Sequence, residues 1–407
     1  MPPTILTGVL EGVRVIDLTQ MLSGPFCTML LADHGAEVIK IEPFGGETTR
    51  GNGPYLDGDE AQTLGGYFQS VNRNKESLVL NLRSAAGQQA ILDLAKKADV
   101  VVSNFRPGVM DRLGLSYEAL ARANPRIVYA SISGFGDDGT GPNAYSGWPA
   151  YDVIAQAMGG VMAITGPDAA TPTKVGPGIG DIFPGTLLAF GIVAALRHAE
   201  REGVGQQVEV AMYDAVVALC ERAIYQYSYT GEIPAGEGCD HPFLAPFGMF
   251  PARDGWVSIA AQNDNFWFVL AEVMGRPDLK SLKGFATKPD RTSNRCEVNR
   301  IVREWTAAFT KAELKKMLGG RIPCGPIQTA AEIMTDPHLE ARGMLVPIEE
   351  GSGRRIVVAG TPVKFSATPG GVRRRGPLIG EHTDATLAAI GYSPERIAAM
   401  RLEGVAG

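Results

Sequence analysis

Val13 to Glu42 read VRVIDLTQMLSGPFCTMLLADHGAEVIKIE, and this stretch decides the fold. Two runs rich in Val and Ile, VRVIDLT and AEVIKIE, enclose the helix-like PFCTMLLADHG. Strand, helix and strand in this order predict a βαβ unit with parallel strands. Similar strand-like runs occur further along the chain, in SLVLNL at 77–82, DVVVSNF at 99–105 and RIVYASISGF at 126–135. We therefore predict an α/β protein with a Rossmann-like parallel sheet, covered by helices on both faces.

The composition is that of a soluble globular protein, with 407 residues, 45% of them hydrophobic and 20% charged. A net charge of -6 gives no global basic field, so we expect neither nucleic acid nor a membrane surface as a partner. The apolar part of Thr186 to Leu196 is short and runs into Arg197, which indicates a buried helix. The five cysteines form no CxxC pair and no metal-ligand spacing with a histidine, so we predict a cytoplasmic protein without a metal.

The pattern also predicts the domain organisation. After about residue 225 the chain becomes rich in turns, and a strand-like GWVSIAA with two helical stretches follows. We predict a large domain in residues 1–225, a smaller inserted α/β domain in 226–335, and a C-terminal segment, 336–407, that returns to the large domain. Ser116 and Ser393 each precede a helix-like run and are predicted N-caps.

No dinucleotide fingerprint follows the first strand, and the motifs of P-loop, α/β-hydrolase and zincin enzymes do not occur. The turn after the first strand reads TQMLSGPF, which is not the GxGxxG of a dinucleotide site. The sequence also has no GxxxxGK[ST], no GxSxG and no HExxH. These absences remove the motif support for P-loop, α/β-hydrolase and zincin functions.

Asp181 stands out because of its neighbours in KVGPGIGDIFPG, between a glycine-rich turn and a long apolar helix. The glycines permit a sharp bend and a close approach by a ligand. A helix that begins just after Asp181 would place the acid near the positive end of the helix dipole, which favours the ionised form. The pattern alone favours a simple N-cap. The alternative is a carboxylate nucleophile that attacks a thioester and carries an acyl group without ATP.

The sequence resembles the class III CoA-transferase family, the CaiB/BaiF type, along nearly its whole length. This family also includes formyl-CoA transferases and α-methylacyl-CoA racemases. The resemblance rests on the stretch 13–42 together with NRNKESLVLNL, NFRPGVMDRLGL, AYDVIAQAMGG, GDIFPGTLLAFGIVAAL, GQQVEVAMYDAV and PLIGEHT. It implies that Asp181 is the nucleophile, which reverses the preference for an N-cap.

The resemblance further implies that a CoA thioester is bound as a substrate and that no cofactor is held permanently. Matched by motif position, the CoA contacts are Gln20, Met21, Leu22, Leu80, Arg83, Asn104, Phe105, Arg112 and Leu113. Arginine suits the CoA phosphates because its planar donors can hold two oxygens. From the residues alone, Leu80 and Phe105 could equally be core, and the arginines surface charges.

Two positions depart from the family pattern. Leu22 stands where some members place a Gln, and Pro43 stands where some carry a basic residue. The oxyanion of the thioester is therefore expected to be stabilised by backbone N–H groups or by Gln20. The second domain also lacks a run of consecutive glycines like the lid loop of formyl-CoA transferases.

The racemase branch of the family is the main alternative. Its members use a His directly before an Asp as a second acid or base, whereas this chain has Tyr151 and Asp152. A tyrosine, with a reference pKa of about 10, is a poor base at neutral pH. The pair favours transfer, with Tyr151 and Asp152 lining the acyl pocket or orienting Asp181. A catalytically inert protein that binds CoA esters is the alternative from another class.

The predicted reaction is CoA transfer from an acyl-CoA to a free carboxylic acid through an aspartyl anhydride and an aspartyl-CoA thioester. By family analogy the donor is succinyl-CoA, and the acceptor is a dicarboxylate such as malate, mesaconate or itaconate. Arg50 and Arg73 are candidates for holding a second carboxylate. The resemblance also implies an interlocked homodimer, with active sites between the large domain of one subunit and the small domain of the other.

Overall fold

The computed structural model describes residues 8–57, 59, 62, 65–137, 140–141, 143–349 and 355–407. The chain divides into two compact units. The first comprises Met1–Val161, Lys174–Tyr225 and Pro337–Gly407, and the second comprises Met162–Thr173 and Gln226–Asp336.

The first unit is built on a six-stranded sheet in which all neighbouring strands run parallel. Its spatial order is β3 (Glu76–Val79), β2 (Glu37–Glu42), β1 (Arg14–Asp17), β4 (Val100–Ser103), β5 (Val128–Ser133) and β6 (Gln207–Ala211). The α/β fold with a Rossmann-like parallel sheet is confirmed. Because the strand order reverses between β1 and β4, the loops that follow these two strands border a crevice, where ligands bind in such sheets.

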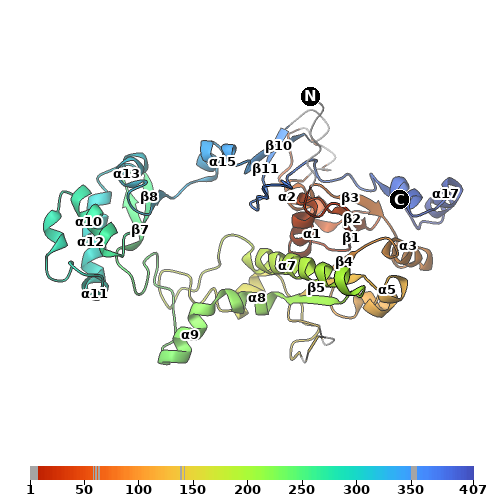
Figure 1. Cartoon of the computed structure of the whole chain (residues 1–407), viewed down its shortest axis with the longest axis horizontal. Coiled ribbons are helices and arrows are strands. Elements are labelled where there is room, and N and C mark those ends of the chain that lie inside the picture. Colours follow the sequence, from red (N-terminus) through yellow and green to blue (C-terminus); the bar gives the residue numbers. More distant parts are fainter. Residues whose placement is uncertain are drawn as a thin grey trace. The chain divides into compact units, whose positions relative to one another are not determined.

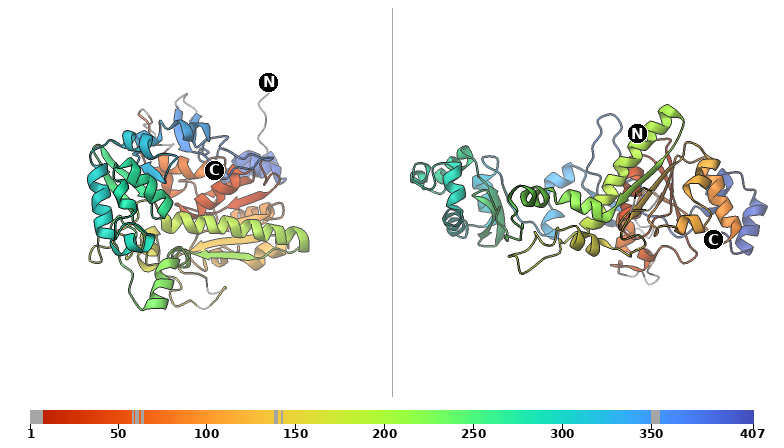
Figure 2. Two further views of the ribbon diagram at one scale, coloured as in Figure 1. Left: turned by 60° about the vertical axis from the view of Figure 1, so that its left-hand side comes forward. Right: turned by 90° about the horizontal axis from the view of Figure 1, so that it is seen from below.

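Helices cover both faces of this sheet (Figures 1 and 2). One face carries α1 (Ser23–Asp33) and α7 (Ile179–Glu202), and the other α3 (Ala85–Ala95), α5 (Tyr117–Ala123), α16 (Thr383–Ala389) and α17 (Pro394–Leu402). Side chains from both the sheet and the second set of helices form one buried apolar core, including Ile16, Ile39, Leu78, Leu120 and Met400. Both predicted N-caps are confirmed, since Ser116 accepts from the N–H of Ala119 and Ser393 from that of Arg396.

Helix α7 connects the site to the core. Of the described helices, it alone is long and apolar enough to cross a membrane by length and composition. One side of it packs on α1, β5 and β6, with Leu188 and Ile192 fully buried. Its other side leaves Phe190 74% exposed and Val193 45% exposed. A side chain on Gly185 would place its Cβ 2.5 Å from the carbonyl oxygen of Ser23, so glycine is what lets α7 approach α1.

Shorter elements complete the first unit. They are α2 (Gly66–Asn72), α4 (Val109–Arg112), α6 (Asp152–Met158), α8 (Met212–Leu219), α15 (Pro337–Ala341) and the antiparallel pair β10 (Leu345–Glu349) and β11 (Arg355–Ala359). The C-terminal segment covers the edge strand β3, because the N–H of His382 donates to the carbonyl of Ser77 at 3.0 Å. Covering an edge in this way removes a template for aggregation.

The second unit contains an antiparallel sheet, β7 (Phe247–Ala252), β8 (Gly255–Ala260) and β9 (Cys324–Pro326). Its main helices are α10 (Asp264–Val273), α11 (Lys288–Ser293), α12 (Arg295–Thr306) and α13 (Lys311–Leu318), and a short α14 spans Ala330–Ile333. Phe250, Trp267 and Val298 are fully buried in a separate core. The helix α9 (Glu221–Thr230) has no buried residue.

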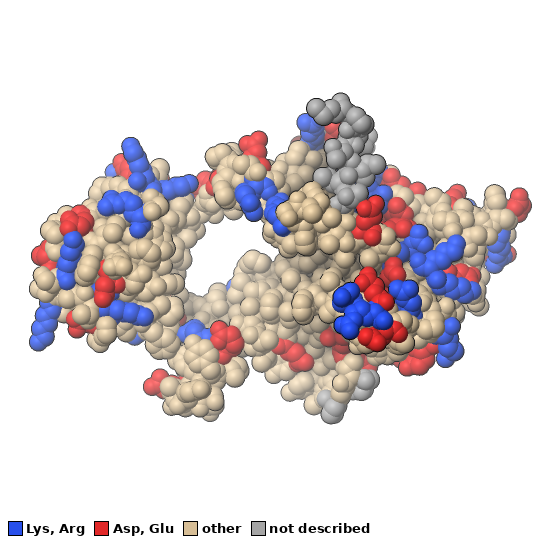
Figure 3. All heavy atoms as spheres, in the orientation of Figure 1, with Lys and Arg blue, Asp and Glu red and all other residues tan. Residues whose placement is uncertain are grey.

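The charged side chains are mixed in sign over the face shown in Figure 3, where Lys and Arg lie among Asp and Glu. This fits the net charge of -6. The absence of nucleic-acid and membrane partners and the cytoplasmic setting stay predictions.

Candidate active site

The loop after β1 is held in place by buried side chains. Asn104, which follows β4, accepts from the N–H of Gln20 at 2.8 Å and donates to its carbonyl at 2.7 Å. Glu47 accepts from the N–H of Met21 at 3.0 Å, and Lys40 donates to the carbonyl of Thr19 at 2.8 Å. Met21 has a φ of 66°, a left-handed conformation uncommon for a residue with a side chain. The loop is thus fixed in a conformation that the isolated chain would rarely adopt.

These hydrogen bonds limit which donors could stabilise the oxyanion that forms when the thioester is attacked. The backbone N–H groups of Gln20 and Met21 already have carbonyl or carboxylate partners, so they are not free to bind a substrate oxygen. The side-chain amide of Gln20 has no partner among the described residues. The Gln20 side chain is therefore an available donor, and so are the backbone N–H groups of Leu22 and Ser23, which have no partner among the described residues.

Asp181 lies in the first turn of α7, which begins at Ile179, two residues before the acid rather than after it. The N-cap is Gly178, so the interpretation of Asp181 as an N-cap is wrong. Its carboxylate makes no hydrogen bond or ion pair with any residue that the structure describes. Burial raises the pKa of Asp181 and the charge of Asp152 raises it further, to about 7. Asp181 lies near the positive end of the helix dipole, as expected, but burial and the charge of Asp152 oppose its ionisation.

Asp152 takes the capping role at this turn. Its carboxylate accepts from the N–H of Gly180 at 2.8 Å and from the side-chain amide of Gln156 at 2.9 and 3.0 Å. Lys174 lies 3.6 Å from it. A side chain on Gly180 would place its Cβ 2.7 Å from the carbonyl oxygen of Asp152, so this close approach requires glycine. Asp152 thus holds the start of α7 and acts on Asp181 through its charge.

The coupling of these two acids predicts a pH effect. Asp181 attacks only as a carboxylate, so kcat/KM should fall as pH drops below about 7. Asp152→Asn keeps an acceptor for the Gly180 N–H but removes the charge, so the pKa of Asp181 falls and the acid limb moves to lower pH. The ratio of kcat/KM at pH 5.5 to that at pH 8 should rise about threefold to tenfold, since one pKa unit is a tenfold change in ionised fraction.

A pH–rate profile of the two proteins tests this coupling. The control is Asp384→Asn, which removes an exposed acid paired with Arg401 and should leave the profile unchanged. An acid limb that stays in place in Asp152→Asn would show that Asp152 does not set the pKa of the nucleophile.

Two cavities meet at the carboxyl edge of the sheet. The first, about 290 Å³, is lined by Asp181 with Gln20, Met21, Asn104, Phe105 and Tyr151, among others. The second, about 650 Å³, is lined by Leu80, Arg83, Phe105 and Leu113 of the predicted CoA contacts. Gln20 and Phe105 line both cavities. The predicted nucleophile and most of the predicted CoA contacts are therefore on adjoining surfaces.

Five predicted residues line neither cavity: Leu22, Arg112, Arg50, Arg73 and Asp152. Leu22 is the N-cap residue of α1, and Arg112 ends α4. Arg50 donates two hydrogen bonds to Glu42, at 2.7 and 2.6 Å, with its guanidinium over the Phe68 ring. Arg73 pairs with Asp33 at 2.8 Å and is also buried. Asp152 does not line the Asp181 cavity either, and reaches it through Gly180.

Tyr67, Arg106 and Trp148 are among the residues that line the Asp181 cavity but were not singled out from the sequence. Burial raises the pKa of Tyr67 to about 12, together with the charges of Asp181, Glu47 and Asp152, so its hydroxyl is a donor at neutral pH. Arg106 lies within the motif NFRPG, in which only Asn104 and Phe105 were predicted to be CoA contacts. Tyr67 lies just before NRNKESLVLNL, and the sequence carries no further signal for it.

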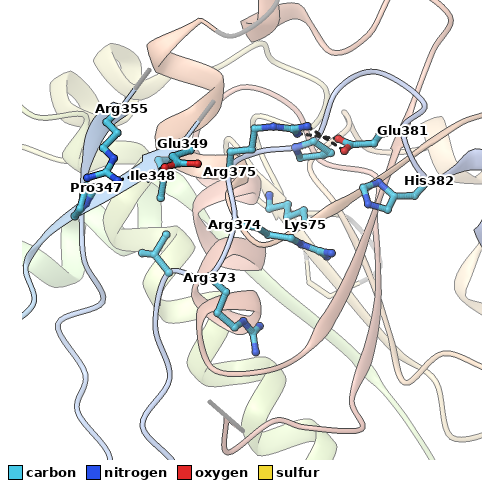
Figure 4. A pocket seen from close by; sticks show the side chains of 12 residues that line it. Lys75, Pro347, Ile348, Glu349, Arg355, Arg373, Arg374, Arg375, Glu381 and His382 are labelled. Carbon is cyan, nitrogen blue, oxygen red and sulfur yellow. Dashed lines mark hydrogen bonds and ion pairs between the residues drawn. The ribbon is translucent and has the colours of Figure 1, made fainter. Parts of the chain in front are cut away.

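Another cavity, about 640 Å³, carries several arginines but is not lined by any predicted site residue (Figure 4). Arg375 pairs with Glu381, Arg374 with Glu76, and Arg355 with Glu349. These guanidinium groups already have partners in the chain. Among the described residues, no three His, Cys, Asp or Glu lie close enough together to hold a metal ion.

A parallel sheet, a cavity at its carboxyl edge lined by an acid without a partner among the described residues, and an adjoining second cavity are features of an α/β enzyme suited to acyl transfer. The family model of CoA-transferase family III matches residues 10–383. The chain belongs to this family and is a CoA-transferase, as the resemblance predicted.

Named relatives agree with this assignment. The succinyl-CoA:mesaconate CoA-transferase of Haloarcula hispanica is 47% identical over 96% of this chain and 99% of its own length. The acetyl-CoA:oxalate CoA-transferase of Acetobacter aceti is 42% identical over 88% of this chain and 90% of its own. A solved CaiB/BaiF family protein from Brucella suis superposes with a TM-score of 0.83 at 33% identity, covering 94% of this chain and all of that one.

Proposed function

We propose that this enzyme transfers CoA from succinyl-CoA to a small dicarboxylic acid, with mesaconate preferred to malate or itaconate, through covalent intermediates on Asp181. The observation that carries the proposal is the carboxylate of Asp181, which lines a cavity beside the predicted CoA surface and has no partner in the described chain. The relative named a succinyl-CoA:mesaconate CoA-transferase, at 47% identity, supports the choice of acids.

The CoA moiety lies in the larger cavity of the first unit. Leu80, Phe105 and Leu113 supply its apolar wall. Arg83 is exposed at its edge, and its guanidinium has no ion pair among the described residues, so it is suited to a CoA phosphate. In this proposal the first unit binds CoA, and the thioester lies near Asp181, where the larger cavity adjoins the smaller one.

The reaction proceeds by two exchanges on one carboxylate. An oxygen of Asp181 attacks the thioester carbonyl, the CoA thiolate leaves, and a mixed anhydride forms. The thiolate then attacks the aspartyl carbonyl, which releases the donor acid and leaves an aspartyl-CoA thioester. The acceptor carboxylate attacks this thioester to form a second anhydride, and the thiolate attacks its acyl carbonyl, which gives the new acyl-CoA and restores Asp181. No oxidant, metal or ATP enters the balance.

The surrounding side chains support these steps. The free amide of Gln20 can donate to the oxyanion that forms at each attack. Tyr67, protonated at neutral pH, is a second donor on the same wall. Asp181 has only part of its surface exposed, and a half-buried anhydride is better protected from water.

Mass spectrometry tests the proposal directly. The protein is incubated with succinyl-CoA and a panel of unlabelled acids, including mesaconate, malate, itaconate and oxalate. We expect a new CoA ester of one added dicarboxylate. If none forms, a chiral 2-methylacyl-CoA in deuterated water is the next substrate, and deuterium at its α-carbon would favour a racemase instead.

We also propose that two copies of the chain form an interlocked homodimer. Several large apolar side chains on or beside α7 and α9 are exposed in the single chain: Phe190, Ile224, Tyr227, Tyr229 and Ile233. We expect these side chains to lie in the interface, since extensive exposed apolar surface is typical of one. Light scattering should give twice the 43.2 kDa of one chain. A mass of 43.2 kDa at working concentration would contradict the dimer.

A further inference from the structure

We propose that Glu47 is a positioning residue of the reaction: its buried carboxylate holds Met21 in a left-handed conformation and so fixes the loop that lines the Asp181 cavity. The effect of Glu47 on turnover rests on the proposed function, whereas its effect on the loop does not. Glu47 lines neither the Asp181 cavity nor the CoA cavity, so it acts through the loop and not on the substrate.

The backbone of Met21 needs support from its surroundings. Its φ of 66° lies in the left-handed region, which a residue with a side chain seldom adopts because Cβ comes close to the following carbonyl oxygen. Met21 lies in the loop between β1 and α1 and lines the Asp181 cavity. Such a conformation persists only where the surrounding contacts outweigh its cost, and it is found most often at functional sites.

The peptide group that joins Gln20 to Met21 is held at both of its polar ends. Asn104 donates to its carbonyl oxygen at 2.7 Å, and Oε1 of Glu47 accepts from its N–H at 3.0 Å. These two contacts fix the plane of the peptide, and that plane sets the φ of Met21. The bond to Glu47 is of the stronger kind, since its acceptor is a carboxylate.

Glu47 is itself held rigidly. It is 3% exposed and is the N-cap of a short 3-10 helix, Thr48–Gly51, where its carboxylate also accepts from the N–H of Thr49 at 3.1 Å and from the Thr49 hydroxyl at 2.6 Å. The N–H of Glu47 donates to the carboxylate of Glu42 at 2.9 Å, and Nζ of Lys40 lies 3.7 Å from the Glu47 carboxylate. Glu42 and Lys40 belong to β2, so the group that holds the loop is anchored to the central sheet.

The conformation of Met21 decides where the donors of this loop point. The side-chain amide of Gln20 and the N–H groups of Leu22 and Ser23 all lie within two residues of it, and Gln20 and Ser23 line the Asp181 cavity. Donors stabilise an oxyanion only when they are already in position as the charge develops. If Met21 leaves the left-handed region, these donors lose their fixed arrangement, so transfer slows although the CoA cavity is unchanged.

Kinetics separates this role from general stabilisation. The exchange of labelled succinate into succinyl-CoA is measured for Glu47→Ala, which removes the carboxylate. We expect kcat to fall about 10-fold to 100-fold, whereas KM for succinyl-CoA and the affinity for CoA in calorimetry change by less than about threefold. Glu47→Gln keeps an acceptor oxygen for the N–H of Met21 and should recover most of the lost kcat.

A second substitution tests the conformation itself. Asparagine adopts the left-handed region more readily than methionine. Met21→Asn should therefore raise kcat at least about threefold more in the Glu47→Ala background than in the wild-type background, and comparing the two backgrounds cancels what the new side chain does in the cavity. An equal effect of Met21→Asn in both backgrounds would show that Glu47 does not hold Met21.

Amide hydrogen exchange reports on the loop without any turnover. Exchange in a peptide that spans residues 18–23 should be faster in Glu47→Ala than in the wild type. Asp33→Asn is the matched control, because Asp33 is also buried but its carboxylate bonds to Arg73 and Asn74 rather than to the loop. This control should lower the free energy of unfolding and leave both kcat and the exchange of the loop unchanged.

Unchanged kcat and unchanged loop exchange in Glu47→Ala, or an equal loss of kcat in Asp33→Asn, would overturn the inference and leave the proposed function standing. If Glu47→Ala does not fold, Glu47→Asp takes its place, because it keeps the charge beside Lys40 and draws the carboxylate back from Met21 by one carbon. A wild type with a protected loop that exchanges no succinate would contradict the proposed substrates, and faster loop exchange in Glu47→Ala would still support the contact between Glu47 and Met21.

Discussion

Asp181→Asn is expected to abolish CoA transfer, with kcat lowered at least about 10³-fold. The substitution keeps the size and shape of the side chain and removes the anionic oxygen that would form the anhydride. Asp181 lines the smaller cavity and not the CoA cavity, so CoA affinity should change little. Transfer is measured by mass spectrometry with succinyl-CoA and mesaconate, and CoA affinity by calorimetry.

The matched control is Asp214, which occupies the third position of α8 as Asp181 does in α7, but is exposed and lines neither cavity. Asp214→Asn should keep full activity. Wild-type turnover in Asp181→Asn, with deamidation of the new Asn excluded by intact mass, would end the covalent mechanism.

The same variant should change stability with a definite sign. The pKa of Asp181 is about 7 in the folded protein, above the value of about 3.9 for an unfolded Asp, so the folded state holds the proton more tightly. The contribution of Asp181 to stability therefore falls as pH rises from about 4 to 7. Asp181→Asn lacks this loss, so its melting temperature at pH 8 should be higher than that of the wild type. The difference in melting temperature should vanish near pH 4. Sites that need a strained or desolvated group commonly show this exchange of stability for activity.

The sheet could be predicted because each strand carries its own signal. Val and Ile runs such as VRVID and EVIKI are buried on both faces in parallel sheets, and nearly apolar sequence marks them. β6, which reads QVEVA, was not predicted as a strand, since its alternating residues are only partly buried at the edge of the sheet. The other edge strand, β3, was predicted because the C-terminal segment covers it and its residues are mostly buried. Local pattern thus gives buried strands more readily than partly exposed ones.

The site could be predicted only in part, because its details depend on contacts between distant residues. The glycine-rich turn pointed to Asp181, but nothing in the turn shows that Asp152, 29 positions earlier, caps the Gly180 N–H. The arginines Arg50 and Arg73 look available in the sequence, and their partners Glu42 and Asp33 lie eight and forty positions away. The sequence shows which residues are arginines, but which carboxylate each arginine pairs with depends on the fold.

A buried ion network beneath the site is expected to have the largest effect on stability. Asp17 and Lys75 are both fully buried, with Nζ of Lys75 2.9 Å from the Asp17 carboxylate. Thr19 and Thr28 also donate to Asp17, and Asn72 accepts from Lys75. Burial alone would raise the pKa of Asp17, but Lys75, Lys40 and these hydrogen bonds outweigh it and lower the pKa to about 2.

Asp17→Asn should therefore destabilise the protein by about 3–5 kcal/mol, because it leaves the ammonium of Lys75 buried without its counter-charge. Urea unfolding at pH 7 measures the change, with Asp384→Asn, from an exposed pair, expected within about 0.5 kcal/mol of wild type. The double variant Asp17→Asn, Lys75→Met should lose less unfolding free energy than the sum of the losses in the two single variants, since it removes both charges together.

Because the pKa of Asp17 in the folded protein lies below its unfolded value, the stabilisation by Asp17 is present above about pH 4 and is lost as pH falls toward 2. Since Asp17 also accepts from the N–H of Thr19, the same substitution should loosen the loop that carries Gln20 and lower kcat even where the protein remains folded. Additive effects of the two single variants would show instead that Asp17 and Lys75 act independently.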